Sequence, residues 1–338
     1  MSSVRRLRCA LAVVLAGALA ACGTAAEHHS AAPTHRATTH PPSATRTPST
    51  PPRSHLPRPH RPARTTTPTT PAPRPRPVPP LPGGGTTLFP QHRIVAYYGS
   101  GDSPGLGVLG QADPETQWNR LQSQAAGYRT SGRAVIPAFE LIAETAQASP
   151  GADGLYRSRA ADSTIARYLA TVRRHHGMLI LDIQPGRSDF LTEAQAFAKW
   201  LDEPDVGLAL DPEWRMGPGQ VPAQEIGSVS AGEVNTVSAW LDRLVARHHL
   251  PQKLFLIHKF TASMITDQEA LADRAHLAEV VNVDGFGTQT DKLEKYHTFA
   301  GETKFPIGLK LFYRQDVDMF TPAQVLALTP APDVVDYQ

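Results

Sequence analysis

The segment Asp211-Pro212-Glu213-Trp214 carries the residue types and the spacing best suited to catalysis in this chain of 338 residues. If it ends a β-strand, Asp211 and Glu213 share one face and lie about 6–7 Å apart along the strand. One carboxyl group can then protonate the oxygen of a glycosidic bond, while its neighbour holds the developing positive charge or positions the reacting group. Trp214 would offer an aromatic surface to a sugar ring. The segment therefore predicts carboxylate acid/base catalysis on a glycan.

Polar side chains also end other short apolar segments that have the composition of strands. Successive strand residues point to opposite faces, so each segment can be phased. The phasing places these residues together on one face: Ile136, Ala138 and Glu140; Ile180, Asp182 and Gln184; Ala209, Asp211 and Glu213; Asn282 and Asp284; Gly308, Lys310 and Phe312; Val334, Asp336 and Gln338. In Lys253–Phe260 either His258 or Lys259 points inward, and the pattern leaves both open.

These side chains predict a cavity mouth lined by carboxylates. Neighbouring like charges disfavour ionisation, which raises a carboxyl pKa and prepares the group as a general acid. The candidate catalytic residues are Glu213, Asp211, Asp182 and Asp284. The candidate substrate-binding residues are Glu140, Trp214, Tyr98, His258, Lys310, Gln184 and Gln338. The alternative interpretation is that some of these carboxylates only form ion pairs with Lys310 or with arginines.

Eight β-rich segments would have to position these groups, with amphipathic segments between them. The segments are Ile94–Gly99, Arg133–Ala143, Met178–Gln184, Val206–Trp214, Lys253–Phe260, Val280–Gly287, Pro306–Tyr313 and Val334–Gln338. Helix starts are indicated by Asp113-Pro114 and by capping boxes at Ser230–Glu233, Thr266–Glu269 and Thr321–Gln324. Strands that alternate with helices favour βαβ units and a parallel sheet.

The fold predicted from this alternation is α/β, a (β/α)8 TIM barrel, whose active site would lie at the C-terminal ends of the strands. A doubly wound open sheet is the alternative, but Tyr97-Tyr98-Gly99-Ser100-Gly101 lacks the full dinucleotide-binding spacing. Strand eight ends the chain without a following helix. We expect the segment around Leu88–His92 to cover the seam between strands eight and one.

The Asp-x-Glu motif on the fourth predicted strand resembles the Asp-x-Glu-bearing barrel glycosidases, in particular the chitinase-like and muramidase-like families. Their resemblance implies that Glu213 is the acid and that Asp211, with Asp182 or Asp284, supports it. The muramidase-like family also has an aspartate on strand one, where this chain has Tyr97-Tyr98-Gly99.

The chitinase-like signature Asp-Gly-x-Asp-x-Asp-x-Glu can be laid on Val206–Glu213. It matches at Gly207, Asp211 and Glu213, whereas Val206 and Ala209 replace two aspartates. These replacements depart from the assisted N-acetyl mechanism of that family.

The N-terminal residues predict a targeting signal rather than a part of the folded domain. Three arginines precede the uncharged stretch Cys9–Ala21, which is typical of a secretory signal. Leu19-Ala20-Ala21-Cys22 resembles the lipobox of bacterial lipoproteins. That resemblance implies cleavage after residue 21, lipidation of Cys22 and a membrane-lipid anchor on the extracytoplasmic face of a bacterial cell membrane. The alternative is an ordinary secretory signal in which Cys22 has no role.

Residues 22–87 are expected to be a disordered Pro/Thr/Arg-rich tether that leads to a barrel domain at 88–338. Of the chain's 32 prolines, 17 lie between Pro33 and Pro82. Such composition favours extended polyproline-like backbone without a packed core. Beyond residue 21 no apolar run approaches the roughly 20 residues of a membrane-spanning helix.

The charge is as uneven as the composition. The formal net charge is +2, of which residues 1–21 contribute +3 and residues 22–85 contribute +7, which leaves −8 for residues 86–338. A net negative domain excludes a nucleic-acid-binding core on charge grounds.

Three function classes remain. The first is a surface-tethered glycoside hydrolase acting on wall or environmental polysaccharide. The second is a barrel with a degenerate site that binds a glycan or another wall polymer without catalysis. The third is a divalent-metal hydrolase using Asp182, Asp211, Glu213, Asp284 and His258, which ranks last because no His-x-His or His-Glu-x-x-His pair is present. We expect a monomer whose partners are membrane lipid and carbohydrate, with no cofactor or metal.

Overall fold

The computed structural model describes residues 77–129 and 133–338, which form a closed barrel of parallel strands. Strand β1 (His92–Gly99) pairs with β2 (Ala134–Ala146) on one side and with β11 (Val334–Tyr337) on the other, so the sheet closes on itself. The order around the barrel is β1, β2, β4, β5, β7, β9, β10 and β11. The predicted eight-stranded α/β barrel is confirmed. The predicted signal peptide and Cys22 lie outside the described residues.

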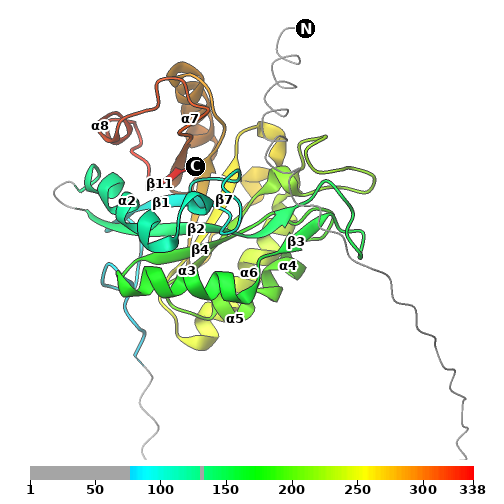
Figure 1. The fold of residues 1–338 in the computed structure, drawn as a ribbon, viewed down its shortest axis with the longest axis horizontal. Helices are drawn as coiled ribbons and strands as arrows, with labels where there is room; N and C mark the ends of the chain where they lie inside the picture. Colours follow the sequence, from blue (N-terminus) through cyan, green and yellow to red (C-terminus); the bar gives the residue numbers. More distant parts are fainter. Residues whose placement is uncertain (1–76, 130–132) are drawn as a thin grey trace, which may run out of the picture. The chain divides into compact units, whose positions relative to one another are not determined.

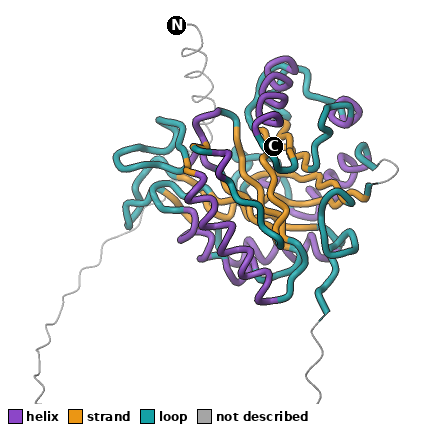
Figure 2. Tube along the Cα trace, turned by 180° about the vertical axis from the view of Figure 1, so that it is seen from behind, coloured by secondary structure: helices purple, strands orange, loops and turns teal. Residues whose placement is uncertain are grey.

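The other barrel strands are β4 (Met178–Ile183), β5 (Val206–Leu210), β7 (Lys253–Lys259), β9 (Leu277–Val283) and β10 (Ile307–Leu311). The short strand β3 (Arg157–Arg159) is antiparallel to the end of β2, and β6 (Val229–Ser230) pairs with β8 (Ile265–Thr266). The helices are α2 (Pro114–Ala126), α3 (Asp162–Arg174), α4 (Phe190–Ala196), α5 (Ala198–Leu201), α6 (Ala231–His248), α7 (Gln289–Glu302) and α8 (Pro322–Leu326). Figure 1 shows α2 beside β1 and α3 beside β4, and Figure 2 shows helices outside the strands from behind.

Three helices begin where the sequence predicts a cap. Asp113 accepts a hydrogen bond from the backbone N–H of Thr116 and precedes Pro114 in the first turn of α2. Thr321 and Gln324 form a reciprocal capping box at α8, which satisfies backbone N–H groups that the helix leaves free. Ser230 caps α6 as predicted, but the carboxylate of Glu233 accepts from Phe190 N and Arg215 Nε instead.

The helix predicted to follow Thr266 is wrong. Asp267 adopts a left-handed conformation with φ 55°, and only a 3-10 turn at Gln268–Ala270 follows it. The side chain of Asn235 on α6 bonds both the backbone C=O of Ala270 and the N–H of Ala272, which fixes this connection in a non-helical path. The chain therefore runs from β7 to β9 without an α-helix, although the pattern of polar and apolar residues there suggests one.

Two separate apolar clusters form the core. The outer cluster lies between the strands and the helices and includes Trp118 on α2, Phe190 on α4 and Leu241 on α6. The inner cluster is built from the inward-facing residues of the strands, for example Ile94, Ala138, Ile180, Ala209, Leu256 and Val280. The inward-facing residues stand at every second position, as the strand phasing predicts.

The floor of the barrel is closed by the segment that leads into β1. Leu81 and Leu88 are buried in the inner cluster, together with inward residues near the starts of the strands. The backbone of Thr86 accepts from Gln252 N just before β7, and Leu88 N donates to Gln252 Oε1. This segment was predicted to cover the seam between strands eight and one, which is a different place. The apolar residues are needed under the barrel because its inner cluster is otherwise open to water at that end.

The seam between β11 and β1 is closed by backbone pairing and covered by aromatic side chains. Tyr337 of β11 is fully buried, stacks on Tyr313 with a centroid distance of 5.5 Å and contacts the hydroxyl of Tyr128. Gln124 of α2 donates to the Tyr337 hydroxyl. Across the two described segments, no helix has the length and apolarity to cross a membrane.

Candidate active site

The C-terminal ends of the barrel strands carry a layer of inward-facing polar side chains, which we call the polar ring. It consists of Tyr98 on β1, Glu140 on β2, Asp182 on β4, Asp211 after β5, His258 on β7, Asn282 and Asp284 on and after β9, Lys310 on β10 and Asp336 on β11. Each of these side chains is at least nine-tenths buried. The polar ring lies directly above the apolar inner cluster and follows the same alternation of residues.

The sequence left open which residue of β7 faces inward, and the structure places His258 there. Lys259 points outward, where its ammonium group donates to Gln268 and to Glu302 at 2.9 Å on α7. The alternation of strand residues therefore leaves His258 as the only β7 side chain in the polar ring. Asn282 and Asp336, which the phasing put on inward faces, were not among the candidate site residues although they lie in the ring.

The Asp211–Trp214 segment is not the strand end that the sequence predicts. Strand β5 ends at Leu210, and Pro212–Trp214 form a 3-10 helix. Pro212 has no N–H for a strand ladder, and Trp214 N instead bonds back to Asp211 O at 3.1 Å. The expected strand spacing between Asp211 and Glu213 does not apply. The turn instead leaves Asp211 buried in the polar ring and raises Glu213 and Trp214, both half-buried, above it.

Glu213 is the most accessible carboxyl group of the site. No hydrogen bond or ion pair holds its carboxylate within residues 77–129 and 133–338. Loss of surrounding water, together with the negative charges of Asp211 and Asp284, raises the pKa of Glu213 well above its usual range. The raised pKa favours the protonated form of this carboxyl group.

His258 links two carboxylates across the interior. Its Nε2 lies 2.7 Å from Glu140 Oε1, and its Nδ1 lies 3.3 Å from Asp284 Oδ2. Burial lowers the pKa of His258, but Glu140 and Asp284 outweigh this and hold it well above its usual range. A protonated imidazole donates from both nitrogens, which matches these two acceptors. His258 therefore acts as a fixed cation between β2 and β9.

Lys310 is the second buried cation. Its Nζ lies 3.3 Å from Asp284 Oδ2 and 3.9 Å from Asp336 Oδ2. The same Nζ is 3.4 Å from the centroid of the Tyr98 ring, a close cation–π contact. Burial raises the pKa of Asp284, but Lys310 and His258 overcome it and hold this carboxyl well below its usual range. Asp284 is therefore held in its ionised form.

Tyr98 connects two other predicted site residues. Its hydroxyl donates to Asp182 Oδ2 at 2.8 Å and accepts from Gln184 Nε2 at 3.1 Å. Gln184 is held in turn by Ala146 N, which donates to its Oε1. Burial raises the pKa of Tyr98, so its hydroxyl keeps its proton as a donor. The three side chains form one hydrogen-bonded path between β1 and β4.

The polar ring holds more carboxyl groups than cations. Burial and the neighbouring negative charges raise the pKa of Asp182 and of Asp336 well above the usual range. Burial also raises the pKa of Asp211, but only to about 6, because the positive charges of His258 and Lys310 oppose the effect of burial. At neutral pH, Asp211 is thus mostly ionised, whereas the protonated form is favoured at Asp182 and Asp336. The site therefore combines carboxyl groups that favour different protonation states, as acid/base catalysis requires.

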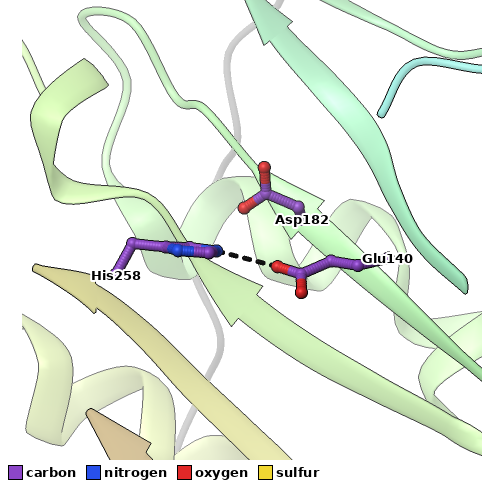
Figure 3. A group of neighbouring side chains, drawn as sticks. All are labelled: Glu140, Asp182 and His258. Atoms are coloured by element: carbon purple, nitrogen blue, oxygen red, sulfur yellow. Dashed lines mark hydrogen bonds and ion pairs between the residues drawn. The ribbon is translucent and has the colours of Figure 1, made fainter. Parts of the chain in front are cut away.

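Three residues of the ring are arranged so that they could hold a divalent cation. The donor atoms of Glu140, Asp182 and His258 lie within 4.8 Å of one another (Figure 3). Glu140 Oε2 and Asp182 Oδ1 are buried without a hydrogen-bond partner. Such a metal would compete with the proton of His258 and its bond to Glu140, since only neutral imidazole ligates. This set differs from the predicted metal set, which left out Glu140.

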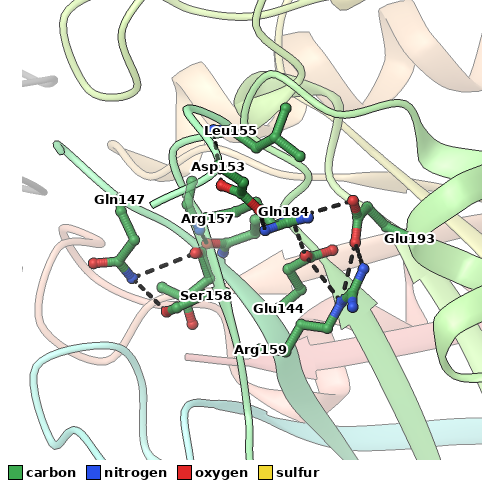
Figure 4. Close-up of polar contacts among 11 residues, drawn as sticks. Glu144, Gln147, Asp153, Leu155, Arg157, Ser158, Arg159, Gln184 and Glu193 are labelled. Atoms are coloured by element: carbon green, nitrogen blue, oxygen red, sulfur yellow. Dashed lines mark hydrogen bonds and ion pairs between the residues drawn. The ribbon is translucent and has the colours of Figure 1, made fainter. Parts of the chain in front are cut away.

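A second buried carboxyl pair supports the strands behind the site (Figure 4). Glu144 of β2 and Glu193 of α4 are fully buried between two arginines of β3. Arg157 Nε lies 2.9 Å from Glu144 Oε1 and 3.1 Å from Glu193 Oε1, and Arg159 also contacts both carboxylates. Burial and Glu193 raise the pKa of Glu144 to about 9, whereas the pKa of Glu193 is lowered. The pair thus shares one proton at neutral pH.

This pair belongs to the framework of the site. A β-bulge lies between Ile142 and Glu144, and Gln184 N bonds to Glu144 O at 3.0 Å. The cluster therefore fixes the end of β2 against the end of β4, where Glu140 and Asp182 stand. It was not predicted, because an Arg-x-Arg pair opposite two distant glutamates has no local pattern.

One predicted contact residue lies elsewhere. Gln338 follows β11 and lines a separate cavity of about 300 Å³ together with Tyr97 and Tyr313. Trp214 stands on the same 3-10 helix as Glu213. The other predicted catalytic and binding residues are brought together by the polar ring and the turn above it.

A scan against protein-family models and a search of curated proteins give no match to this chain.

Proposed function

We propose that this protein is a surface-tethered glycoside hydrolase that cleaves wall or environmental polysaccharide at the mouth of its barrel. The observation that carries the proposal is the state of Glu213. It is a half-buried carboxyl group whose raised pKa favours the protonated form, it has no fixed partner in the described residues, and it stands over buried carboxylates and cations. This combination suits a general acid that protonates the leaving-group oxygen.

In this proposal Glu213 and Asp211 carry out the cleavage. Glu213 gives its proton to the glycosidic oxygen as the bond between that oxygen and the anomeric carbon breaks. Asp211, mostly ionised at its pKa of about 6, stabilises the positive charge that grows on the sugar. A water molecule attacks the anomeric carbon, its oxygen forms the new bond to that carbon, and it gives one proton to the carboxylate of Glu213. The net reaction is hydrolysis, and the enzyme ends in its starting protonation state.

The remaining residues of the ring position these carboxyl groups. Lys310 and His258 keep Asp284 ionised, and Asp284 together with Asp211 raises the pKa of Glu213. Tyr98 and Gln184 hold Asp182 at the edge of β4. The choice of a glycan is supported by Trp214 beside the acid and by the resemblance of the Asp-x-Glu motif to barrel glycosidases. Barrel enzymes carry their active sites at this end of the strands.

Glu213→Gln tests the proposal, with Glu294→Gln on α7 as a matched control that removes the same charge from an exposed position. Release of reducing ends from a panel of wall and soluble glycans should fall at least ~10³-fold in the first variant and stay unchanged in the control. Circular dichroism would show that both variants fold. The wild-type rate should fall below about pH 6, as Asp211 gains a proton. It should fall again at high pH as Glu213 loses its proton.

The alternative function is a barrel that binds glycans without cleaving them. In that case wild-type protein releases no product from any glycan, and Glu213→Gln binds the same glycans with unchanged affinity. Anchoring belongs to the same proposal, because the lipobox at Leu19–Cys22 would retain the enzyme at the extracytoplasmic face of the cell membrane. A single modified cysteine with more than one acyl chain anchors a protein stably.

A further inference from the structure

A cavity beside the mouth has the chemistry of a binding site for acidic sugars. Its volume is about 300 Å³, and it is lined by Tyr97, Gly107, Gln117, Arg120, Tyr313, Arg314 and their neighbours. The lining comes from the connection after β1, from α2 and from the connection after β10. β11 lies between β1 and β10 in the sheet, so the cavity sits at the C-terminal end of the strands, on the same end of the barrel as Glu213.

Two arginines give the cavity its charge. Arg120 and Arg314 are exposed, come from separate parts of the chain and have no hydrogen bond or ion pair with any described residue. The side chains of the other lining residues are neutral in the portion of the chain that the structure describes. Other arginines of the described chain, such as Arg157 and Arg173, are paired with carboxylates. Two guanidinium groups without ion-pair partners at one cavity can bind a carboxylate or a phosphate.

The cavity also offers groups that match a sugar ring. Tyr313 is 40% exposed although its ring stacks on Tyr337, and Tyr97 meets it edge-on at 6.2 Å. Burial raises the pKa of Tyr97 and of Tyr313, so neither hydroxyl becomes an anion that would repel the ligand.

A buried amide in the wall lacks one partner. Gln117 is only 1% exposed, and its Nε2 donates to Val108 O. Its Oε1 is buried and has no hydrogen-bond partner in the described residues. A buried acceptor without a donor costs free energy, and a hydroxyl group of a bound sugar would satisfy it.

We propose that this cavity is a subsite for an anionic sugar or polyol unit, bound by Arg120 and Arg314 and packed on Tyr313. The inference rests on the proposed function and makes its substrate an acidic glycan. Glu213 follows β5, which lies across the barrel from β11. A ligand that reaches both sites therefore has several units, with the acidic unit distant from the cleaved bond.

Binding experiments test the subsite without depending on cleavage. The probes are a hexamer of uronic acid, the same hexamer with its carboxyl groups reduced to alcohols, and an oligomer of glycerol phosphate. Titration calorimetry would compare wild type, Arg120→Gln/Arg314→Gln and the control Arg243→Gln/Arg247→Gln, which removes two exposed arginines of α6. We expect wild type to bind at least one anionic probe roughly tenfold more tightly than the reduced hexamer.

The cavity double variant should lose this preference, the α6 control should keep it, and added salt should weaken it. Binding of the uronate or of the phosphate probe distinguishes the two anions. The proposal is wrong if neither anionic probe binds more tightly than the reduced hexamer, or if the cavity double variant keeps the preference. Failure of the hydrolase proposal would appear separately, as absence of product while the arginine-dependent preference persists.

Discussion

Removing the ammonium group of Lys310 would test the electrostatic account of the site. The side chain is 2% exposed, and its Nζ faces Asp284 at 3.3 Å and Asp336 at 3.9 Å. Lys310→Met keeps much of the apolar stem but leaves the Asp284 charge buried with His258 alone. Removing one partner of a buried ion pair typically costs about 3–5 kcal/mol. We therefore expect the free energy of unfolding at pH 7 to fall by about that amount.

A second substitution separates charge from packing. In Lys310→Met/Asp284→Asn the uncompensated carboxylate is gone, so about half of the loss should be recovered, at roughly 2 kcal/mol. Urea denaturation followed by tryptophan fluorescence and circular dichroism measures both variants. Equal stability of the single and double variants, or a loss below about 1 kcal/mol in the single variant, would contradict the buried-cation account.

The pH dependence gives an independent check. In wild type the pKa of Asp284 is lowered in the folded state, so its contribution to stability is present above its unfolded pKa of about 4 and is lost as the pH falls further. Without Lys310 this folded pKa rises. The deficit of Lys310→Met should therefore be largest near pH 7 and shrink toward pH 5, as Asp284 takes up a proton. A deficit that stays constant over this range would refute the reasoning.

Two further predictions concern other parts of the chain. Glu144 has a folded pKa of about 9, above its unfolded value, so stability should fall as the pH rises from about 4.5 to 9. Glu144→Gln should remove this dependence and raise the thermal midpoint at pH 9 by roughly 3–10 °C, with a smaller rise at pH 6, as calorimetry would show. Cys22→Ala should abolish incorporation of a labelled fatty acid and move the protein from the detergent phase to the aqueous phase on Triton X-114 partitioning. Labelling that persists in this variant would exclude Cys22 as the lipidated residue.

The alternation of side chains made much of the barrel interior predictable. Glu140, Asp182, Asp284 and Lys310 were phased correctly from the residues two positions away, because a strand buried on both faces still has a period of two. His258 could not be separated from Lys259, since both are polar and each is satisfied by partners distant in the sequence. Such partners become visible only when the barrel closes.

The errors arose where local patterns compete with tertiary contacts. The sequence analysis placed Glu213 at the mouth by extending the strand through residues 211–213. The strand instead ends at Leu210, and the turn at Pro212 brings Glu213 to the mouth. The capping pattern at Thr266 does not lead to a helix. The side chain of Asn235 forms hydrogen bonds with the backbone of Ala270 and Ala272, so these groups are not available to a helix. The role of Leu81 under the barrel could not be seen, because it stands in a proline-rich stretch ahead of the expected domain start at 88.

The floor segment leaves the barrel with one open end. Leu81 and Leu88 close the end opposite the polar ring and lead straight into β1. The inward-facing polar groups can therefore meet a ligand only at the other end, where the half-buried Glu213 and Trp214 stand.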